Sequence, residues 1–206
     1  MGAPKLTGLA KDCGKAAKIL HDFLEDGKIP RDIIAKAQGL AIFTGFRAGM
    51  YLAGGGGSGV VFARLADGTW SPPSAFSVRS GSIGLVYGVD VYNCVCVLNT
   101  RSAVDAYTKP ELELGGAAEL AVGPVGGTAN TRGEPKPIWT YTKSRGLYGG
   151  LTVDGTVIKE KSDENAAFYG SSVTSVQILQ GKVEPQEGDE VWPAGAGKLT
   201  AALETV

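Results

Sequence analysis

The fold is decided by residues 47–75, which read RAGMYLAGGGGSGVVFARLADGTWSPPSA. Four consecutive glycines lead into VVFARL, an apolar run with the length and composition of a strand. Asp67-Gly68 follows it, and both of these residues tolerate the positive φ of a two-residue hairpin turn. We therefore expect this stretch to form a sheet, with a glycine-rich hairpin or bulge before the strand and a tight turn after it.

The chain after residue 40 repeats this pattern of short apolar runs separated by glycine and proline, which is typical of a meandering antiparallel sheet. Asp154-Gly155 predicts a second tight hairpin on the same grounds. The 31 glycines follow no G-X-Y repeat and fit tight turns and close backbone contacts within a sheet. The apolar runs are LAIFT (40–44), SGVVFARL (58–65), CVCVL (94–98), LAVG (120–123), IWTYT (138–142) and GTVIKE (155–160).

The N-terminal segment has the periodicity of an amphipathic helix that ends near Gly27. A shorter helix is expected from Pro30 to Gly39, because proline suits the first turn of a helix. Capping residues predict further short helices at 100–107, 162–169 and 174–180. The apolar stripe of the first helix comprises Leu6, Leu9, Cys13, Ala16, Ala17, Leu20, Phe23 and Leu24, and Lys11, Lys15 and Lys18 lie on the opposite face.

These patterns predict the α+β class. We expect a single compact domain over residues 1–183, with a mostly antiparallel, barrel-like sheet core, an N-terminal amphipathic helix and short flanking helices. Residues 184–206 are first acidic and then rich in proline and glycine, so we expect a flexible tail there.

Motifs for cofactors, metals and catalysis are incomplete. Gly54, Gly56 and Gly59 have the spacing of a dinucleotide-binding loop, but that loop requires a helix next, and a strand pattern follows. The one histidine, His21, has no nucleophile or orienting group signalled near it. Cys94 and Cys96 lack a second pair of ligands and fit buried thiols on a strand. We expect no enzyme, no cofactor and no metal.

Charge and cysteine content limit the partners and the compartment. The net charge is −1, but residues 1–50 hold eight Lys and Arg against five Asp and Glu. A basic excess this local disfavours a general nucleic-acid binder. An odd number of cysteines, no apolar leader and no glycosylation acceptor indicate a reducing cytosolic setting. No apolar run reaches the length of a membrane span, so any membrane contact would be peripheral.

The lysines of the first helix admit two interpretations. They precede the acids at 22–26, which is the reverse of the order that the helix dipole favours. They form either the solvent face of a core helix or a basic face that meets phosphate groups. Each lysine near an anionic leaflet contributes about 1 kcal/mol, so four of them, Lys5 included, would give only about millimolar binding. Useful affinity would need insertion of Leu6 and Leu9, a headgroup pocket or clustering of several copies.

Seven strings, taken with their order and spacing, resemble the SYLF domain family, a module of yeast cortical actin-patch proteins and of phosphoinositide-binding animal and plant proteins. They cover residues 15 to about 183. The strings are KAAKIL (15–20), IPRDIIAKAQGLAI (29–42), RAGMYLAGGGGSGVVFARLADGTWSPPSA (47–75), VLNTRSAVDAY (97–107), GPVG (123–126), YTKSRGLYGG (141–150) and FYG (168–170).

The resemblance implies a compact, mostly β domain that binds acidic phosphoinositides and, in fungal members, actin filaments, in endocytosis and actin organisation. The family's lipid contact is associated with its N-terminal basic helix. That association transfers to Leu6, Leu9, Lys11, Lys15 and Lys18. Lys143 and Arg145 match the basic pair before the glycine-rich strand and form a second candidate site.

Three departures from the family pattern remove positive charge. Cys13 and Gly14 stand where the family has lysine, the glycine run lacks its arginine, and the basic stretch before FYG is reduced to KEKSDENAA (159–167). We therefore expect lipid affinity that is weaker than in the family or redirected.

Two functional hypotheses follow. The first is a non-catalytic protein that binds phosphoinositide-containing membranes and F-actin at the cytoplasmic side of the cell cortex, as a peripheral membrane protein. The second is a soluble carrier that holds a lipid or another apolar small molecule within the β core, near Val60, Phe62, Trp139 and Tyr141.

Overall fold

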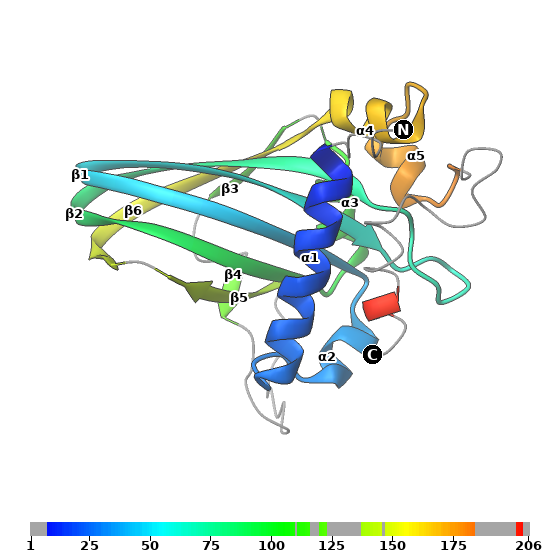
Figure 1. The fold of residues 1–206 in the computed structure, drawn as a ribbon, viewed down its shortest axis with the longest axis horizontal. Helices are drawn as coiled ribbons and strands as arrows, with labels where there is room; N and C mark the ends of the chain where they lie inside the picture. Colours follow the sequence, from blue (N-terminus) through cyan, green and yellow to red (C-terminus); the bar gives the residue numbers. More distant parts are fainter. Residues whose placement is uncertain are drawn as a thin grey trace, which may run out of the picture.

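The computed structural model describes residues 8–109, 111–115, 120–122, 137–145, 147–183 and 201–203. In these ranges the chain forms one α+β domain in which helices flank a six-stranded sheet (Figure 1), and this confirms the predicted fold class. The elements are α1 (Gly8–Glu25), α2 (Arg31–Lys36), β1 (Gly39–Ala63), β2 (Ser74–Leu98), α3 (Arg101–Ala106), β3 (Glu111–Gly115), β4 (Leu120–Val122), β5 (Ile138–Ser144), β6 (Leu147–Glu160), α4 (Ser162–Tyr169) and α5 (Ser175–Leu179).

β2 is the central strand of the sheet. The strands follow the order β3-β6-β2-β5-β4, and β1 pairs with β2 outside this path. The first part of β2 (76–89) pairs with β6, and its last part (92–98) pairs with β5. These pairings, together with β1–β2 and β3–β6, are antiparallel, whereas β4 and β5 run parallel. The mostly antiparallel sheet predicted from the apolar runs is therefore confirmed.

β1 and β2 each run for 25 residues and have to bend. A straight strand of that length would extend about 80 Å, roughly twice the diameter of a compact domain of this size. β1 changes register between Met50 and Leu52, and Figure 1 shows it running to the end of the sheet drawn at the left and returning. Two runs that the sequence predicts as separate strands, 40–44 and 58–65, therefore belong mostly to one long strand.

The returning half of β1 lies with its backbone directly against the backbone of the first half. A Cβ atom at Gly57 would lie 2.8 Å from the Cα of Gly45 and closer still to the carbonyl oxygen of Thr44. A Cβ atom at Gly59 would meet the carbonyl oxygen of Ile42 in the same way. Any side chain here would force the two backbones apart, so the predicted close backbone contact is confirmed. The predicted hairpin or bulge lies before the glycine run, at the register change.

Asp67-Gly68 forms the predicted tight turn. Gly68 has a φ of 86°, which L-residues rarely adopt. The Asp67 carboxylate accepts a hydrogen bond of 2.9 Å from the backbone N–H of Thr69. Arg64 and Trp70, on either side of the turn, form an isolated antiparallel bridge.

The hairpin predicted at Asp154-Gly155 is wrong. Both residues lie inside β6, where they pair with Ser82 and Gly81 of β2. Gly155 also pairs with Gly115 of β3 on the other side. Because β2 and β3 supply hydrogen-bond partners for the backbone N–H and C=O groups at this point, β6 stays extended and no turn forms.

Local capping signals place the short helices where the sequence predicts them. The Thr100 hydroxyl accepts a hydrogen bond from the Ala103 N–H at the start of α3, and Thr174 forms a capping box with Gln177 at the start of α5. Gly170 ends α4 with a φ of 68°. α2 ends at Lys36, three residues before the predicted Gly39, where β1 already begins.

The sheet is buried on both of its faces near the helices. On one face the stripe of α1 packs against β1 and β2, as Figure 1 shows. On the other face the buried side chains of the strands pack against one another and against α3. The first cluster includes Leu9, Cys13, Ala16, Leu20, Phe23, Leu40, Ile42, Val95 and Val97, and the second includes Phe43, Val61, Phe76, Cys96, Val104 and Tyr107.

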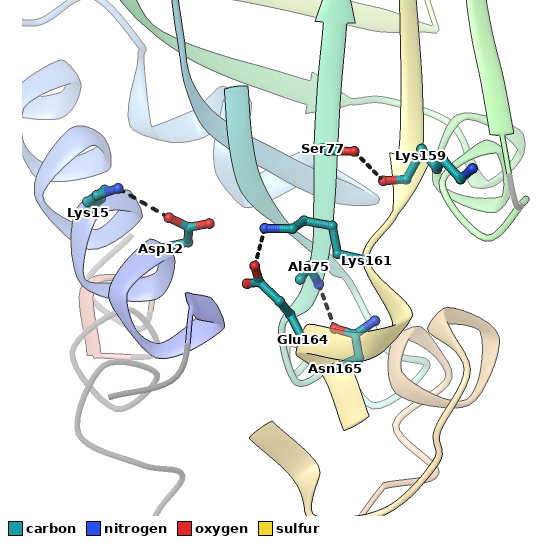
Figure 2. A network of polar contacts seen from close by, with 8 residues as sticks. All are labelled: Asp12, Lys15, Ala75, Ser77, Lys159, Lys161, Glu164 and Asn165. Atoms are coloured by element: carbon teal, nitrogen blue, oxygen red, sulfur yellow. Dashed lines mark hydrogen bonds and ion pairs between the residues drawn. The ribbon is translucent and has the colours of Figure 1, made fainter. Parts of the chain in front are cut away.

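α4 is joined to the start of β2 by a buried amide (Figure 2). Asn165 is fully buried, and its side-chain oxygen accepts a hydrogen bond of 2.8 Å from the backbone N–H of Ala75. Its amide nitrogen donates to the Ser74 hydroxyl at 3.2 Å. Lys161 and Glu164 form an ion pair beside it. The start of β2 is thereby fixed to α4, since Ala75 and Asn165 are 90 residues apart in the chain.

The predicted domain boundary at residue 183 stays a prediction. Most of the predicted flexible tail, 184–200 and 204–206, lies outside the described residues. Residues 201–203 are helical, and Leu203 is buried in the core cluster beneath α1. Leu203 is therefore packed in the described structure, whereas the flexible tail as a whole stays a prediction.

Candidate functional site

The first candidate is α1, whose position on the sheet decides which of its side chains are available. Leu9, Cys13, Leu20 and Phe23 are almost completely buried against the sheet. Leu9 therefore contributes to the core, and the expectation that it inserts into a membrane does not fit this packing. Leu6, the other residue expected to insert, lies outside the described residues.

The basic face of α1 points away from the sheet. Lys11, Lys15 and Lys18 are all exposed, as the period of the apolar stripe predicts. Lys15 lies 3.3 Å from a carboxylate oxygen of Asp12, whose side chain is buried (Figure 2). Lys11 and Lys18 form no ion pair within the described part of the chain. The helix thus presents three cations on one face, and one of them is already paired.

The second candidate pair, Lys143 and Arg145, lies at the end of β5. The Lys143 ammonium is 2.7 Å from a carboxylate oxygen of Asp26, directly after α1. This hydrogen bond and the positive charge of Lys143 lower the pKa of Asp26 below its usual value. Arg145 is exposed, and its backbone N–H donates to the carbonyl oxygen of Val91 at 2.9 Å. Lys143 therefore holds α1 to the sheet, whereas the Arg145 side chain is on the surface.

α1 covers only part of the sheet face on which it lies. Side chains alternate along a strand, so the face that carries Leu40 and Ile42 beneath α1 continues through Thr44 to Phe46 and Met50. Beyond Thr44 its large apolar side chains are exposed. We name this surface the distal apolar face; it comprises Phe46, Met50, Tyr87, Val89 and Val91. Figure 1 shows that β1 and β2 extend well beyond α1, so the helix lies over only part of their length.

The sequence analysis did not identify the distal apolar face, although a signal for it exists. Phe46 and Met50 on β1 alternate with Arg47 and small residues, and the register sets them opposite Val91 and Tyr87. This alternation indicates one apolar face on a two-stranded ribbon. Whether that face is covered depends on where α1 crosses the sheet, which the pattern does not indicate.

On the opposite face of the same ribbon, a partly exposed arginine pairs with a buried carboxylate. The Arg47 guanidinium donates to one carboxylate oxygen of Asp90 at 3.0 and 3.3 Å, and Asp90 is almost completely buried. The guanidinium also lies 5.1 Å from the ring centre of Tyr92. The backbone N–H of Arg145 donates to the second Asp90 oxygen at 3.2 Å. The only carboxylate in the sequence of β1 and β2 is therefore hidden from the surface.

The cysteines are buried within the core. Burial raises the pKa of Cys13, and contact with Cys94 together with burial raises the pKa of Cys96. The sulfur atoms of Cys94 and Cys96 lie 3.7 Å apart on one strand face. In the described ranges no group of three or more His, Cys, Asp or Glu side chains is placed to hold a metal ion. Within the same ranges, no helix is both long and apolar enough to cross a bilayer.

The four side chains proposed to line a carrier cavity are packed in the core beneath α1. Val60, Phe62, Trp139 and Tyr141 all belong to the cluster that includes the α1 stripe. A hollow of about 430 Å³ lies elsewhere, between α3 and α5, and another of about 450 Å³ lies beside Tyr87. Neither of these is lined by the four side chains.

Comparison with known proteins identifies the family. The Ysc84 family, described as "Las17-binding protein actin regulator", matches residues 79–206, which is more than half of the chain. The chain belongs to the Ysc84 family. This confirms the resemblance to the SYLF domain family found in the sequence strings.

Relatives from fungi and animals align with most of the chain. "LAS seventeen-binding protein 3" from Saccharomyces cerevisiae is 37% identical over 190 residues, which is 86% of this chain and 41% of the yeast protein. "SH3 domain-containing YSC84-like protein 1" from Rattus norvegicus is 38% identical over 205 residues, which is 93% of this chain and 60% of the rat protein. The chain thus spans about two-fifths to three-fifths of these relatives. No solved structure matches it.

The Ysc84 match includes several of the surfaces described above. It begins at Arg79 and so takes in most of β2, the strands β3 to β6 and the helices α3 to α5, whereas β1 precedes it. Lys143, Arg145 and the β2 part of the distal apolar face lie inside it, whereas α1 and its lysines precede it. The alignments with the relatives are longer, since they take in 86–93% of the chain.

Proposed function

We propose that this Ysc84 domain is a non-catalytic binding module that joins phosphoinositide-containing membranes to actin filaments at the cell cortex, in endocytosis and actin organisation. The observation that carries the membrane part is the docked α1 helix, whose lysine face points outward while its apolar face is anchored in the core. A fixed cationic surface attracts anionic headgroups without the chain having to fold on the membrane.

Electrostatics alone gives this surface a weak affinity. Lys11 and Lys18 form no described ion pair, and Lys15 shares its charge with Asp12. At about 1 kcal/mol for each cation near an anionic leaflet, the three together give at most about 3 kcal/mol, which is weaker than millimolar binding. Because Leu9 is in the core, stable attachment requires a further contact or several copies on one membrane.

The actin part of the proposal rests on the family and its relatives. The family description names an actin regulator that binds Las17, and the yeast relatives carry the names LAS seventeen-binding protein 3 and YSC84. The structure supports a binding role for the domain because its charged and apolar surface groups lie on a rigid sheet and helix. An absence of catalysis fits the lack of a nucleophile–base pair among the motifs in the sequence.

The membrane part is tested by co-sedimentation with vesicles that contain phosphatidylinositol bisphosphate, over a range of salt concentrations. We expect binding to the vesicles that falls as salt rises, and a loss of at least fivefold in the double variant K11E/K18E. Lys15 is left unchanged because a carboxylate there would face Asp12. The matched control is K109E/K182E, which makes the same change in net charge at exposed lysines outside α1.

Equal losses in both double variants would mean that only net charge matters and would remove α1 from the proposal. Pelleting of the same preparation with F-actin, without vesicles, tests the actin part independently. No pelleting at protein concentrations up to about 100 µM, well above the micromolar range of ordinary cytoskeletal contacts, would limit the proposal to lipid.

A further inference from the structure

The distal apolar face exposes five large apolar side chains, although most of the apolar side chains described in this domain are buried. Its exposed fractions are 55% for Phe46, 63% for Met50, 75% for Tyr87, 64% for Val89 and 45% for Val91. The register makes Phe46 the neighbour of Val91 and Met50 the neighbour of Tyr87, so the five side chains form one continuous patch. A hollow of about 450 Å³ opens beside it, lined by Gly49, Tyr87, Gly88 and Val89.

The size of this patch places it among surfaces that bind something. With roughly 150–250 Å² for each large side chain, the exposed parts sum to about 500 Å². The largest apolar patch on a monomeric soluble protein is about 300–600 Å² and often functional. Within the described part of the chain, α1 covers this sheet face only as far as Ile42, so packing against the helix does not require these residues to be apolar.

A second copy of the chain does not suit this patch. A stable protein interface buries about 800 Å² on each partner. The patch, at about 500 Å², is smaller than that. The charged residues on β1 and β2 themselves are Arg47, Arg79 and Asp90, and Asp90 is buried, so the two strands that carry the patch expose no carboxylate.

An anionic lipid surface suits it on two grounds. The first ground is charge, since the exposed Arg145 follows β5 and is hydrogen-bonded through its backbone to Val91, a member of the patch. Tyr87, the most exposed member, has an apolar ring and a polar hydroxyl, the combination that prefers the boundary between headgroups and hydrocarbon.

The patch and the lysine face lie on the same side of the sheet. α1 packs on the face that carries Leu40 and Ile42, and the patch continues that face beyond Thr44. Lys11, Lys15 and Lys18 point outward from the same face, one helix layer higher. A surface that combines several cations with an apolar insertion supplies the two signals that stable attachment of a peripheral protein requires.

We propose that the distal apolar face inserts its Met50 and Tyr87 side chains into the headgroup–hydrocarbon boundary of an anionic bilayer, while the lysine face of α1 contacts the headgroups. This rests on the proposed membrane function and adds to it the contact that the lysines alone do not supply. It also replaces the expected insertion of Leu9 by insertion of residues that are already exposed.

The test uses the full chain and vesicles of phosphatidylcholine with phosphatidylinositol bisphosphate. In the double variant M50S/Y87S we expect vesicle partitioning to fall at least tenfold, since each side chain loses most of its apolar area. The melting temperature should be unchanged, because both side chains are exposed in the folded state. The matched control is V176S, which removes an exposed apolar side chain on α5, outside the patch, and should leave partitioning within twofold.

A second measurement reports insertion directly. Cys13, Cys94 and Cys96 are buried, so a single cysteine introduced by M50C accepts an environment-sensitive fluorophore selectively. We expect a blue shift and at least a twofold rise in emission when M50C meets the vesicles, and no change when V176C carries the label.

The outcomes separate this inference from the proposed function. Vesicle binding by the native chain with no loss in M50S/Y87S and no spectral change at position 50 overturns the insertion but leaves the lysine-based membrane contact in place. A loss of F-actin pelleting or of self-association in M50S/Y87S, with vesicle binding retained, overturns lipid as the occupant. A native chain that does not bind vesicles at any salt concentration overturns both proposals.

Discussion

Replacing Gly57 by alanine tests the close contact between the two halves of β1. The new Cβ would lie 2.8 Å from the Cα of Gly45 and closer still to the carbonyl oxygen of Thr44. Both are backbone atoms, so they cannot move aside by changing a rotamer. Overpacking in a well-packed core typically costs 1–3 kcal/mol, and a clash with backbone falls at the upper end, so we expect a loss of about 3 kcal/mol.

Gly54→Ala is the matched control, three residues earlier in the same strand. A Cβ at Gly54 would meet no atom within 4 Å, and the residue does not have a positive φ. Alanine there reduces the freedom of the unfolded chain, so we expect no loss and up to about 1 kcal/mol of added stability. For a domain of this size a change of 1 kcal/mol moves Tm by about 2–4 °C. Tm should therefore fall by about 6–12 °C in G57A and stay the same or rise in G54A.

Differential scanning calorimetry measures both variants, and urea denaturation gives the free energy of unfolding independently. An unchanged m-value in urea would show that the stability of each variant changes without a change in the surface exposed on unfolding. A Tm for G57A within 2 °C of that for G54A would refute the reasoning, because the two halves of β1 would then not lie backbone against backbone.

Three further predictions concern the core and the α1 contacts. Leu9→Ala should lower the free energy of unfolding by about 2–5 kcal/mol in urea titrations, whereas Lys11→Ala should change it by less than about 0.5 kcal/mol; equal effects would contradict the docking of α1. Asn165→Leu should cost about 1–3 kcal/mol, because a buried backbone N–H loses its acceptor, and faster hydrogen exchange of that N–H checks it. The contact between Asp26 and Lys143 should stabilise the fold above the unfolded pKa of the carboxyl and be lost as pH falls through its lowered folded pKa; an NMR titration of Asp26 that shows no downward shift would exclude it.

Features encoded by neighbouring residues could be predicted from the sequence. The α1 stripe, the caps at Thr100 and Thr174 and the turn at Asp67-Gly68 depend on residues a few positions apart, and the structure contains all of them. The hairpin predicted at Asp154-Gly155 shows the limit of this reasoning. The same turn residues occur there, but strands from elsewhere in the chain pair on both sides and keep the backbone extended.

The candidate site could be predicted only in part, again because it depends on contacts between distant parts of the chain. An apolar stripe opposite lysines looks the same whether the stripe faces a core or a bilayer, and only the packing of Leu9 against the sheet distinguishes the two. The ion pair between Lys143 and Asp26 joins residues far apart in sequence. The exposure of Met50 and Tyr87 depends on where α1 ends on the sheet, which is a property of the assembled fold.

The central place of β2 has a consequence for how the chain is made. One edge of β2 pairs with β1, which is synthesised before it. The other edge pairs with β5, as Leu98 does with Ile138, and with β6, as Phe76 does with Glu160. Both of these strands are synthesised much later than β2. Pairing between such distant segments is slow, and an unpaired edge of this length attracts other chains. A nascent chain that stalls after residue 98 would expose a long unpaired edge of β2, which favours association with other chains.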